Sequence, residues 1–264
     1  MSAEPAPSLP APVKLGSRVF PWDTLVAKPT PLGVYRAVVD APTATFERFE
    51  CHVTTLNPGE KSHPPHHHPQ EEFIVLREGT LDVFINGRVQ RAGAGSLLFF
   101  AANDVHNVTN VGDTPATYVV FNVVTAATHR VPAQPAAETA APGRLHSSVF
   151  DWRQIPVEAT KSGERRAIVD APTVTFTNFE AHATTLRAGQ IAHGAHHHPD
   201  EEIILVKEGT IEATFGGKTE RGGPGSIFFY GSNDVHGMRN AGDGTATYYV
   251  IRIVTPVSAV PDHA

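Results

Sequence analysis

Two histidines and a glutamate in the first half of the chain have the types and the spacing of metal ligands. His66 and His68 stand two positions apart, so in an extended strand both imidazoles point to one face, roughly 6.6 Å apart along the chain. Pro69 suits the second position of a turn, which would return Glu72 to the two rings. Neutral imidazoles with a carboxylate are ligands of divalent transition metals. The same types recur as His196, His198 and Glu202.

A further histidine in each half is the candidate for a fourth ligand. His106 follows an apolar segment and an Ala-Ala-Asn-Asp turn, and His236 stands at the corresponding place. Asn103 and Asn233, within these turns, are of the non-glycine type that best tolerates a positive φ. Three imidazoles and a carboxylate around an octahedral ion leave two positions open, which suits iron or manganese binding O₂ or a bidentate substrate. We therefore predict two divalent metal sites per chain.

An internal duplication puts both ligand sets in equivalent positions. Leu15 aligns with Leu145, and the same offset of 130 residues carries Val124 onto Val254. The intervening segment is rich in Pro and Ala and has no periodicity. The repeat predicts an N-terminal domain at 15–125, a linker at 126–144 and a C-terminal domain at 145–255.

The segments that must position these ligands have the patterns of strands. Residues 45–56 alternate, with Phe49 and Cys51 on one parity and Glu50 and His52 on the other. Residues 80–85 alternate too and end at Asn86-Gly87, a strong hairpin signal that Gly216-Gly217 replaces in the second copy. The runs at 118–124 and 248–254 are β-branched and aromatic, as in buried strands. The sequence predicts an all-β sandwich or barrel in each half.

With these motifs the chain resembles the cupins, and specifically the two-domain bicupins. The first cupin motif is represented by Gly59, His66, His68, Glu72 and Gly79, and in the second copy by Gly189, His196, His198, Glu202 and Gly209. The second motif is represented by Gly95, His106 and Asn110, and by Gly225, His236 and Asn240. The departures are one extra residue after the first glycine of each copy and the loss of a proline and a glycine in the second motif. All of them fall in turns, and none affects a ligand position.

The resemblance implies a fold and a metal centre. Each half should form a double-stranded β-helix, or jelly-roll barrel, with three histidines and one glutamate around a metal ion. The family uses manganese, iron, nickel, copper, cobalt and zinc, of which we favour iron or manganese here. The resemblance covers about 110 residues in each copy.

Composition and charge exclude several classes of protein. No run approaches the roughly 18 apolar residues of a membrane span. The formal net charge of −6, with no basic stripe, argues against nucleic acid as a partner. The single cysteine, Cys51, excludes an internal disulfide framework, and Met1 to Pro12 lacks the pattern of an export signal. We expect a cytoplasmic protein with a small-molecule substrate, and a homodimer is compatible with the sequence.

Several polar residues near the motifs have roles that the sequence leaves open. His63 and His193 could support the ligands or line the mouth of a barrel. Glu71 and Glu201 have the wrong parity to bind beside the ligand glutamates, so we expect these two glutamates to be solvated or to support the site. Glu50 and His52 share the polar face of one strand, and a cross-strand hydrogen bond or a domain interface would explain their presence there. The copies also differ at positions whose direction no parity argument decides, namely Arg48/Asn178, Phe100/Tyr230, Thr109/Arg239 and Asn122/Arg252.

Three classes of function are compatible with two such sites. The first, which we favour, is an oxygenase acting on a small organic acid, a diketone or a phenol. The second is non-oxidative metal chemistry, such as a decarboxylase, an isomerase or a lyase. The third is a barrel that binds a small molecule or stores metal without catalysis. No dedicated acid–base residue stands out in the sequence.

Overall fold

Strands dominate the structure. A computed structural model describes residues 13–132, 134 and 142–258, so the central residues of the linker lie outside the described part of the chain. Within these residues there is no α-helix, and none of the helical turns could span a membrane. The helical turns are the 3-10 segments η1 (Trp22–Thr24), η2 (Thr128–Arg130) and η3 (Trp152–Gln154). The predicted all-β class with two cupin repeats is confirmed.

The N-terminal barrel encloses its interior with two antiparallel sheets. Its strands are β2 (Lys28–Thr30), β3 (Gly33–Ala41), β4 (Arg48–Leu56), β5 (Glu71–Glu78), β6 (Thr80–Ile85), β7 (Arg88–Gly93), β8 (Leu97–Phe100), β9 (His106–Asn110), β10 (Ala116–Val124) and β11 (Ser148–Phe150). The large sheet has the order β11-β8-β5-β10-β4-β3-β2, and the small sheet has the order β7-β6-β9.

The C-terminal barrel repeats this arrangement. Its strands are β1 (Arg18–Phe20), β12 (Glu158–Ala159), β13 (Gly163–Ala171), β14 (Asn178–Leu186), β15 (Ile191–His196), β16 (Glu201–Glu208), β17 (Ile211–Phe215), β18 (Lys218–Gly222), β19 (Ile227–Tyr230), β20 (His236–Asn240) and β21 (Ala246–Val254). The large sheet has the order β1-β19-β16-β21-β14-β13-β12, and the small sheet has the order β15-β20-β17-β18.

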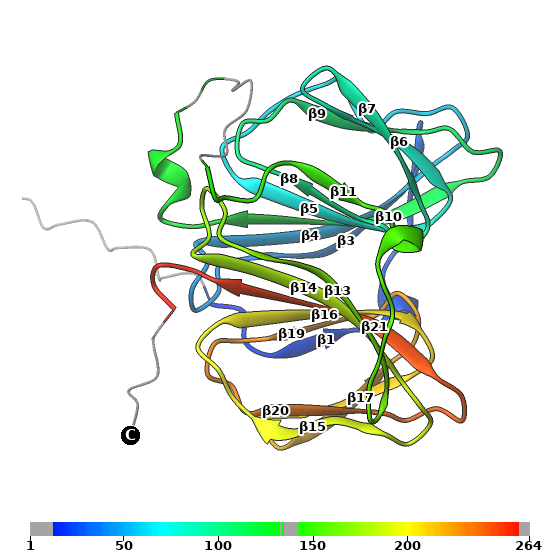
Figure 1. Ribbon diagram of the computed structural model, residues 1–264, viewed down its shortest axis with the longest axis vertical. Helices are drawn as coiled ribbons and strands as arrows, with labels where there is room; N and C mark the ends of the chain where they lie inside the picture. Colours follow the sequence, from blue (N-terminus) through cyan, green and yellow to red (C-terminus); the bar gives the residue numbers. More distant parts are fainter. Residues whose placement is uncertain (1–12, 133, 135–141, 259–264) are drawn as a thin grey trace, which may run out of the picture.

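One short strand of each repeat lies in the sheet of the other repeat. β1 pairs with β19, and β11 pairs with β8, both antiparallel. Figure 1 shows the blue β1 within the lower barrel and the green β11 within the upper one. The predicted ranges 15–125 and 145–255 therefore each contribute one short strand to the opposite barrel.

Two tryptophans fix these exchanged strands in place. Trp152, after β11, packs on Gly95, and Trp22, after β1, packs on Gly225. The two glycines have φ values of 95° and 89°, and a Cβ atom on either would lie 2.7 Å from the indole. Only glycine combines this backbone conformation with so close an approach.

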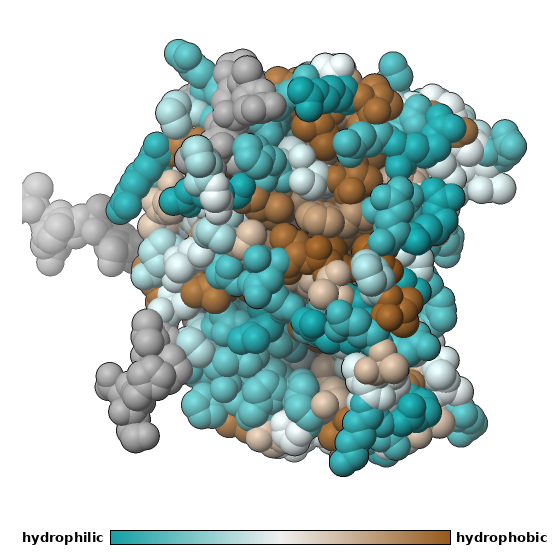
Figure 2. Space-filling view, in the orientation of Figure 1, coloured by the Kyte–Doolittle hydropathy of each residue, from teal (hydrophilic) through white to brown (hydrophobic). Residues whose placement is uncertain are grey.

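Aromatic side chains form the core between the two large sheets. Phe49 stacks on Phe229 of the other barrel with ring centroids 5.3 Å apart, and Phe73 meets Phe179 at 5.2 Å. Cys51 is buried in the same core, as predicted for a small core residue. Each buried phenylalanine stabilises the assembly by about 1.5–3 kcal/mol. On the surface, apolar residues gather near the level where the two sheets meet (Figure 2).

The predicted turns are confirmed by their backbone angles. Asn86 and Gly87 have φ values of 45° and 85° and connect β6 to β7 in a hairpin in which Ile85 pairs with Arg88. Asn103 and Asn233 have φ values of 63° and 61° in the turns before β9 and β20. The ligand histidines at the start of these strands are thereby placed at the end of a tight turn.

The two glutamates beside the ligand glutamates are not solvated, which corrects the sequence-based expectation. Glu71 and Glu201 are buried in the interface between the barrels. Glu71 accepts hydrogen bonds from the hydroxyls of Thr173 and Thr175 and from the backbone N–H groups of Val174 and Thr175. Their parity was assigned correctly, but the face opposite the metal ligands is covered by the other barrel rather than by water.

Candidate metal centres

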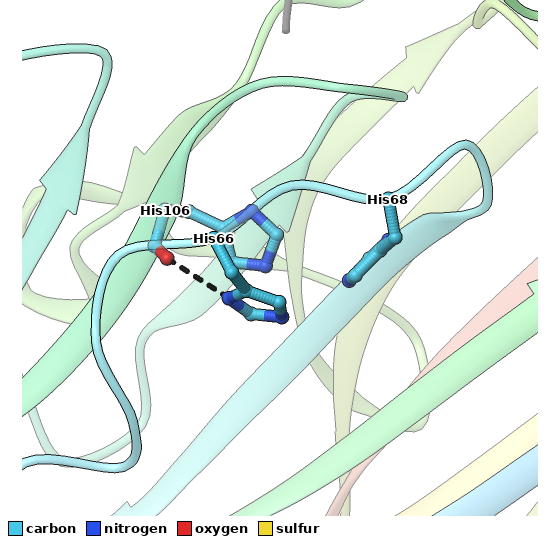
Figure 3. Close-up of side chains that lie close together, drawn as sticks. All are labelled: His66, His68 and His106. Carbon is cyan, nitrogen blue, oxygen red and sulfur yellow. Dashed lines mark hydrogen bonds between the residues drawn. The ribbon is translucent and has the colours of Figure 1, made fainter. Parts of the chain in front are cut away.

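The first histidine cluster combines a loop with the start of a strand. His66 and His68 lie on the segment before β5, and His106 begins β9. The backbones of His66 and His106 pair with each other through hydrogen bonds of 3.2 and 2.9 Å. One ring nitrogen from each histidine lies within 4.8 Å of the others. Figure 3 shows the three rings gathered around a common space.

The second cluster has the same construction in the C-terminal barrel. His196 ends β15, His236 begins β20, and these two residues pair directly across the small sheet. With His198 they bring three ring nitrogens within 4.8 Å of one another. The spacing of the repeat therefore recurs as geometry, and each cluster could hold a metal ion.

A glutamate carboxylate lies beside each histidine cluster. Glu72 lies on β5 with its side chain in the barrel, where its Oε2 is 3.4 Å from His68 Nε2 and its Oε1 is 3.9 Å from His106 Nε2. Glu202 lies 3.3 and 3.9 Å from the corresponding nitrogens of His198 and His236. The structure thus brings together all eight predicted ligand residues, four in each barrel.

Backbone carbonyl groups orient the imidazoles. Nδ1 of His106 donates to the carbonyl of Asp104 at 2.8 Å, and Nδ1 of His68 donates to the carbonyl of Gln70 at 2.9 Å. With Nδ1 protonated, Nε2 carries the free lone pair and faces the cluster. Such outer contacts select the tautomer that can bind a metal.

Unpaired buried atoms show that the residues fit a cation. Nε2 of His106, Nε2 of His198, Nε2 of His236 and Oε1 of Glu202 are buried and have no hydrogen-bond partner among the described residues. Buried polar atoms are nearly always paired, so four unpaired atoms in two clusters need an explanation. A divalent ion in each barrel would satisfy all of them. Ligation itself stays a prediction.

The electrostatic environment favours the ligating forms of two residues. Burial lowers the pKa of His106 to about 4, so its imidazole is neutral at physiological pH. Burial opposes ionisation of Glu72, but the hydrogen bond with His68 and the neighbouring imidazole of His106 outweigh it and lower the pKa of this carboxyl group. A neutral imidazole and an ionised carboxylate are the forms that bind metal ions.

An aromatic ring supports the deepest histidine of each cluster. Phe100 stacks on His106 with ring centroids 4.2 Å apart, and Tyr230 stacks on His236 at 4.1 Å. Phe100 and Tyr230, which occupy the same position of the repeat, therefore lie inside the barrels. The Tyr230 hydroxyl is buried without a partner among the described residues.

The cavities beside the two clusters differ in size and charge. The N-terminal cavity measures about 550 Å³, and its lining contains no Lys or Arg among the described residues, with Tyr35, Ile74, Val108 and Tyr118 among its walls. The C-terminal cavity measures about 300 Å³ and includes Arg165 and Arg252.

Charged pairs occupy part of the C-terminal barrel. Arg252 forms two hydrogen bonds with Asp200, at 2.7 and 3.0 Å, and Arg165 contacts Glu180 at 3.3 Å. Burial lowers the pKa of His198, but the carboxylates of Asp200 and Glu202, each 3.3 Å from a ring nitrogen, outweigh it and raise this pKa to about 9. The arginine at 252 and the aspartate at 200 stand where the first copy has Asn122 and Gln70, so the same fold provides a more open first site.

Sequence reasoning did not assign Glu50 and His52 to the barrel interior. His52 lines the N-terminal cavity and binds Glu50 within its own strand at 2.8 Å, and Asn122 donates to the same carboxylate at 3.1 Å. Their shared parity was visible in the sequence. Both faces of β4 are covered in the structure, so parity alone could not tell the cavity from the interface.

The other residues whose roles the sequence left open lie at the surface or at the edge of the two sites. Arg48 pairs with Asp40 on an exposed surface, and Arg239 pairs with Glu212 at the surface. The ring centroid of His63 lies 3.9 Å from that of His66, and His193 is placed 4.1 Å from His196 in the same way. His63 and His193 therefore lie next to the ligand sets, as residues of the cavity rims.

Comparisons with solved structures find the same two-barrel fold. A serine-to-alanine mutant of Bacillus subtilis oxalate decarboxylase OxdC superposes with a TM-score of 0.67 and 15% identity, over 92% of this chain and 78% of that chain. AerE from Microcystis aeruginosa matches with a TM-score of 0.65 and 15% identity, over 87% and 98%. A formate complex of Lactobacillus farciminis oxalate decarboxylase gives a TM-score of 0.68 and 15% identity, over 94% and 90%. At this identity the likeness concerns the fold.

The sequence matches a family model twice. The cupin domain model aligns with residues 52–122 and again with residues 182–252, which contain both ligand sets. A comparison with curated proteins finds no match. The resemblance inferred from the motifs is confirmed, and the chain belongs to the cupin domain family as a two-barrel bicupin.

Proposed function

We propose that this bicupin is a divalent-metal-dependent oxygenase that acts on a diketone or a phenolic compound in the N-terminal barrel. The observation that carries the proposal is the cavity of about 550 Å³ beside His66, His68, Glu72 and His106. A volume in this range suits a small organic ligand with an apolar body.

The lining of this cavity supports a substrate of low charge. It offers apolar walls, the hydroxyl groups of Tyr35 and Tyr118 and the amide of Asn122, without a lysine or an arginine among the described residues. A dianionic substrate would find no side-chain cation there to offset the loss of its hydration. A diketone or a phenol presents oxygen atoms to the ligand set while its body contacts Val108, Ile74 and neighbouring walls.

A bound iron or manganese ion would supply Lewis-acid and redox chemistry at the four ligands. The chain itself holds those ligands in place through the backbone contacts of the imidazoles and the stacking of Phe100. The apolar walls exclude water from the bound ligand and orient it toward the ligand set. We favour iron or manganese because three imidazoles and one carboxylate leave two positions of an octahedron open.

A second candidate function is non-oxidative decarboxylation of a small carboxylate in the C-terminal barrel. Its support is the presence of Arg165 and Arg252 in the lining of the smaller cavity. The guanidinium groups could bind a substrate carboxylate if it displaced their present partners, Glu180 and Asp200. The solved oxalate decarboxylases named above share this fold, which makes the reaction class worth testing.

Oxygen consumption separates the two candidates. Protein loaded separately with iron and with manganese is offered diketones, catechols and small dicarboxylates, and both oxygen uptake and carbon dioxide release are recorded. The proposed oxygenase consumes oxygen in the presence of a diketone or a catechol and does not convert either compound under argon. Carbon dioxide release from a dicarboxylate under argon would favour the second candidate. Binding without turnover under either condition would indicate a binding protein.

A further inference from the structure

A second polar group lies at the wall of the N-terminal cavity, apart from the predicted metal ligands. On β4, the imidazole of His52 binds the carboxylate of Glu50, with Nδ1 and Oε1 2.8 Å apart. Both side chains are mostly buried, with exposed fractions of 21% and 15%. Asn122, on the neighbouring β10, donates its amide to the other carboxylate oxygen at 3.1 Å. Glu50 is therefore held from two sides in one orientation.

This arrangement leaves one nitrogen of His52 free. Because the carboxylate of Glu50 can only accept at Nδ1, that nitrogen carries the proton and Nε2 carries the lone pair. Within the described part of the chain, Nε2 makes no hydrogen bond. Tyr35 packs against the ring with centroids 5.2 Å apart and fixes its plane. Tyr35, His52 and Asn122 all line the cavity.

Asn122 adds an independent sign that something binds here. Its Oδ1 atom is buried and has no partner among the described residues, although its amide nitrogen is engaged by Glu50. In the sheet register Asn122 stands between Glu50 on β4 and the ligand Glu72 on β5. A ligand that donates a hydrogen bond to this oxygen would therefore lie close to both Glu50 and the predicted ligand Glu72.

We propose that His52, positioned by Glu50, accepts the proton of a hydroxyl-bearing substrate, a phenol or an enol, bound in the N-terminal barrel. This inference rests on the proposed function and deepens it by naming the ionisable class of substrate. The O–H bond of the substrate breaks, its electron pair stays on the oxygen, and the proton moves to Nε2 of His52. The imidazolium then stays hydrogen-bonded to the carboxylate of Glu50, and the proton later leaves to product or water.

The C-terminal barrel contains the same pair in a different setting. His182 binds Glu180 at 2.6 Å, but Arg165 contacts the same carboxylate oxygen at 3.3 Å. Arg165 stands at the position of Tyr35 in the first repeat. Its positive charge already neutralises the carboxylate of Glu180, which would otherwise stabilise a protonated His182. The cavity is also about 300 Å³ instead of about 550 Å³. Proton acceptance is therefore assigned to the N-terminal pair, and His182 provides a matched control.

The test uses 4-nitrocatechol as a probe of proton transfer without turnover. The probe changes its visible absorption when a phenol group ionises, and zinc-loaded protein is used because zinc has no redox chemistry. The wild-type protein should bind the probe in its ionised form at pH 6.5. His52→Gln should weaken this binding about tenfold or more and reduce the ionised fraction, because a hydrogen bond to a charged group is lost. His182→Gln should behave as the wild type.

Two further variants separate positioning from folding. Glu50→Gln should lower the ionised fraction while leaving zinc content and unfolding midpoint near the wild-type values, and Glu50→Asp should restore part of it. An unchanged ionised fraction in His52→Gln, with the probe still bound, would overturn the role of His52 and leave the proposed function standing. Failure of the zinc-loaded wild-type protein to bind the probe would contradict both.

Discussion

Glu71 offers the sharpest test of how the two barrels are joined. Its carboxylate is fully buried and accepts four hydrogen bonds from the segment 173–175 of the other repeat. Glu71→Ala removes all four. The two threonine hydroxyls can turn to other acceptors, but two backbone N–H groups would lose their acceptor, that of Thr175 in a buried position and that of Val174 in a partly buried one. An unpaired buried N–H group costs about 1–3 kcal/mol, so for the two groups we expect a loss of about 2–6 kcal/mol in the free energy of unfolding.

Urea denaturation followed by fluorescence measures this loss. Glu78, at the exposed end of the same strand, provides the control, and Glu78→Ala should change the free energy of unfolding by no more than about 0.5 kcal/mol. Glu71→Gln should fall between the two, because its amide oxygen can still accept while its NH₂ group faces donors. Since exchanged strands and a shared core connect the barrels, both should unfold in one transition.

A small effect would refute the reasoning. If Glu71→Ala lost less than about 1 kcal/mol, the four hydrogen bonds would not stabilise the interface as their burial implies. Separate unfolding of the two halves in the wild-type protein would likewise contradict the connection through strand exchange.

Three further outcomes follow from the same structure. His106→Ala and His236→Ala should each reduce bound metal from about two ions per chain to about one, and the double variant should bind none, as measured by elemental analysis. Metal should be retained at pH 7.5 and lost on dialysis at pH 4, because protonated imidazoles cannot ligate, and full retention at pH 4 would argue against these ligands. Burial raises the pKa of Glu201 to about 7. Because this carboxyl group binds its proton more tightly in the folded state, its contribution to the free energy of unfolding is present at pH 4 and is lost as the pH rises to 7. Glu201→Gln should therefore reduce the fall in the free energy of unfolding between pH 4 and pH 7 by roughly 3 kcal/mol.

Local patterns in the sequence were sufficient for the class of fold and for the ligand sets. Alternation with a period of two identified β4 and β6, and Asn86-Gly87 identified the hairpin between β6 and β7, because strand geometry and turn angles depend on neighbouring residues. The ligand sets were visible because His66, His68 and Glu72 lie within seven positions of one another and recur at a fixed offset. His106 was found through the turn that precedes it.

The partners of each strand were not visible in that way. The repeat predicted two consecutive domains but gave no sign that β1 and β11 each pair with the sheet of the other repeat. Which sheet edge a three-residue strand joins depends on what the rest of the chain leaves unpaired, and here the fit of Trp152 on Gly95 secures the choice.

The sequence by itself determined which residues could bind metal, that the chain is duplicated, and that its elements are strands. The tertiary structure alone decided where the polar residues of those strands face. Parity separated Glu71 from Glu72 and Cys51 from His52, but both faces of these strands are covered, one by the other barrel and one by the barrel interior. Alternation tells which side of a strand a residue is on, but not what covers that side. The buried carboxylate of Glu71 at the interface and the His52–Glu50 pair beside the cavity therefore became distinguishable only when distant strands packed together.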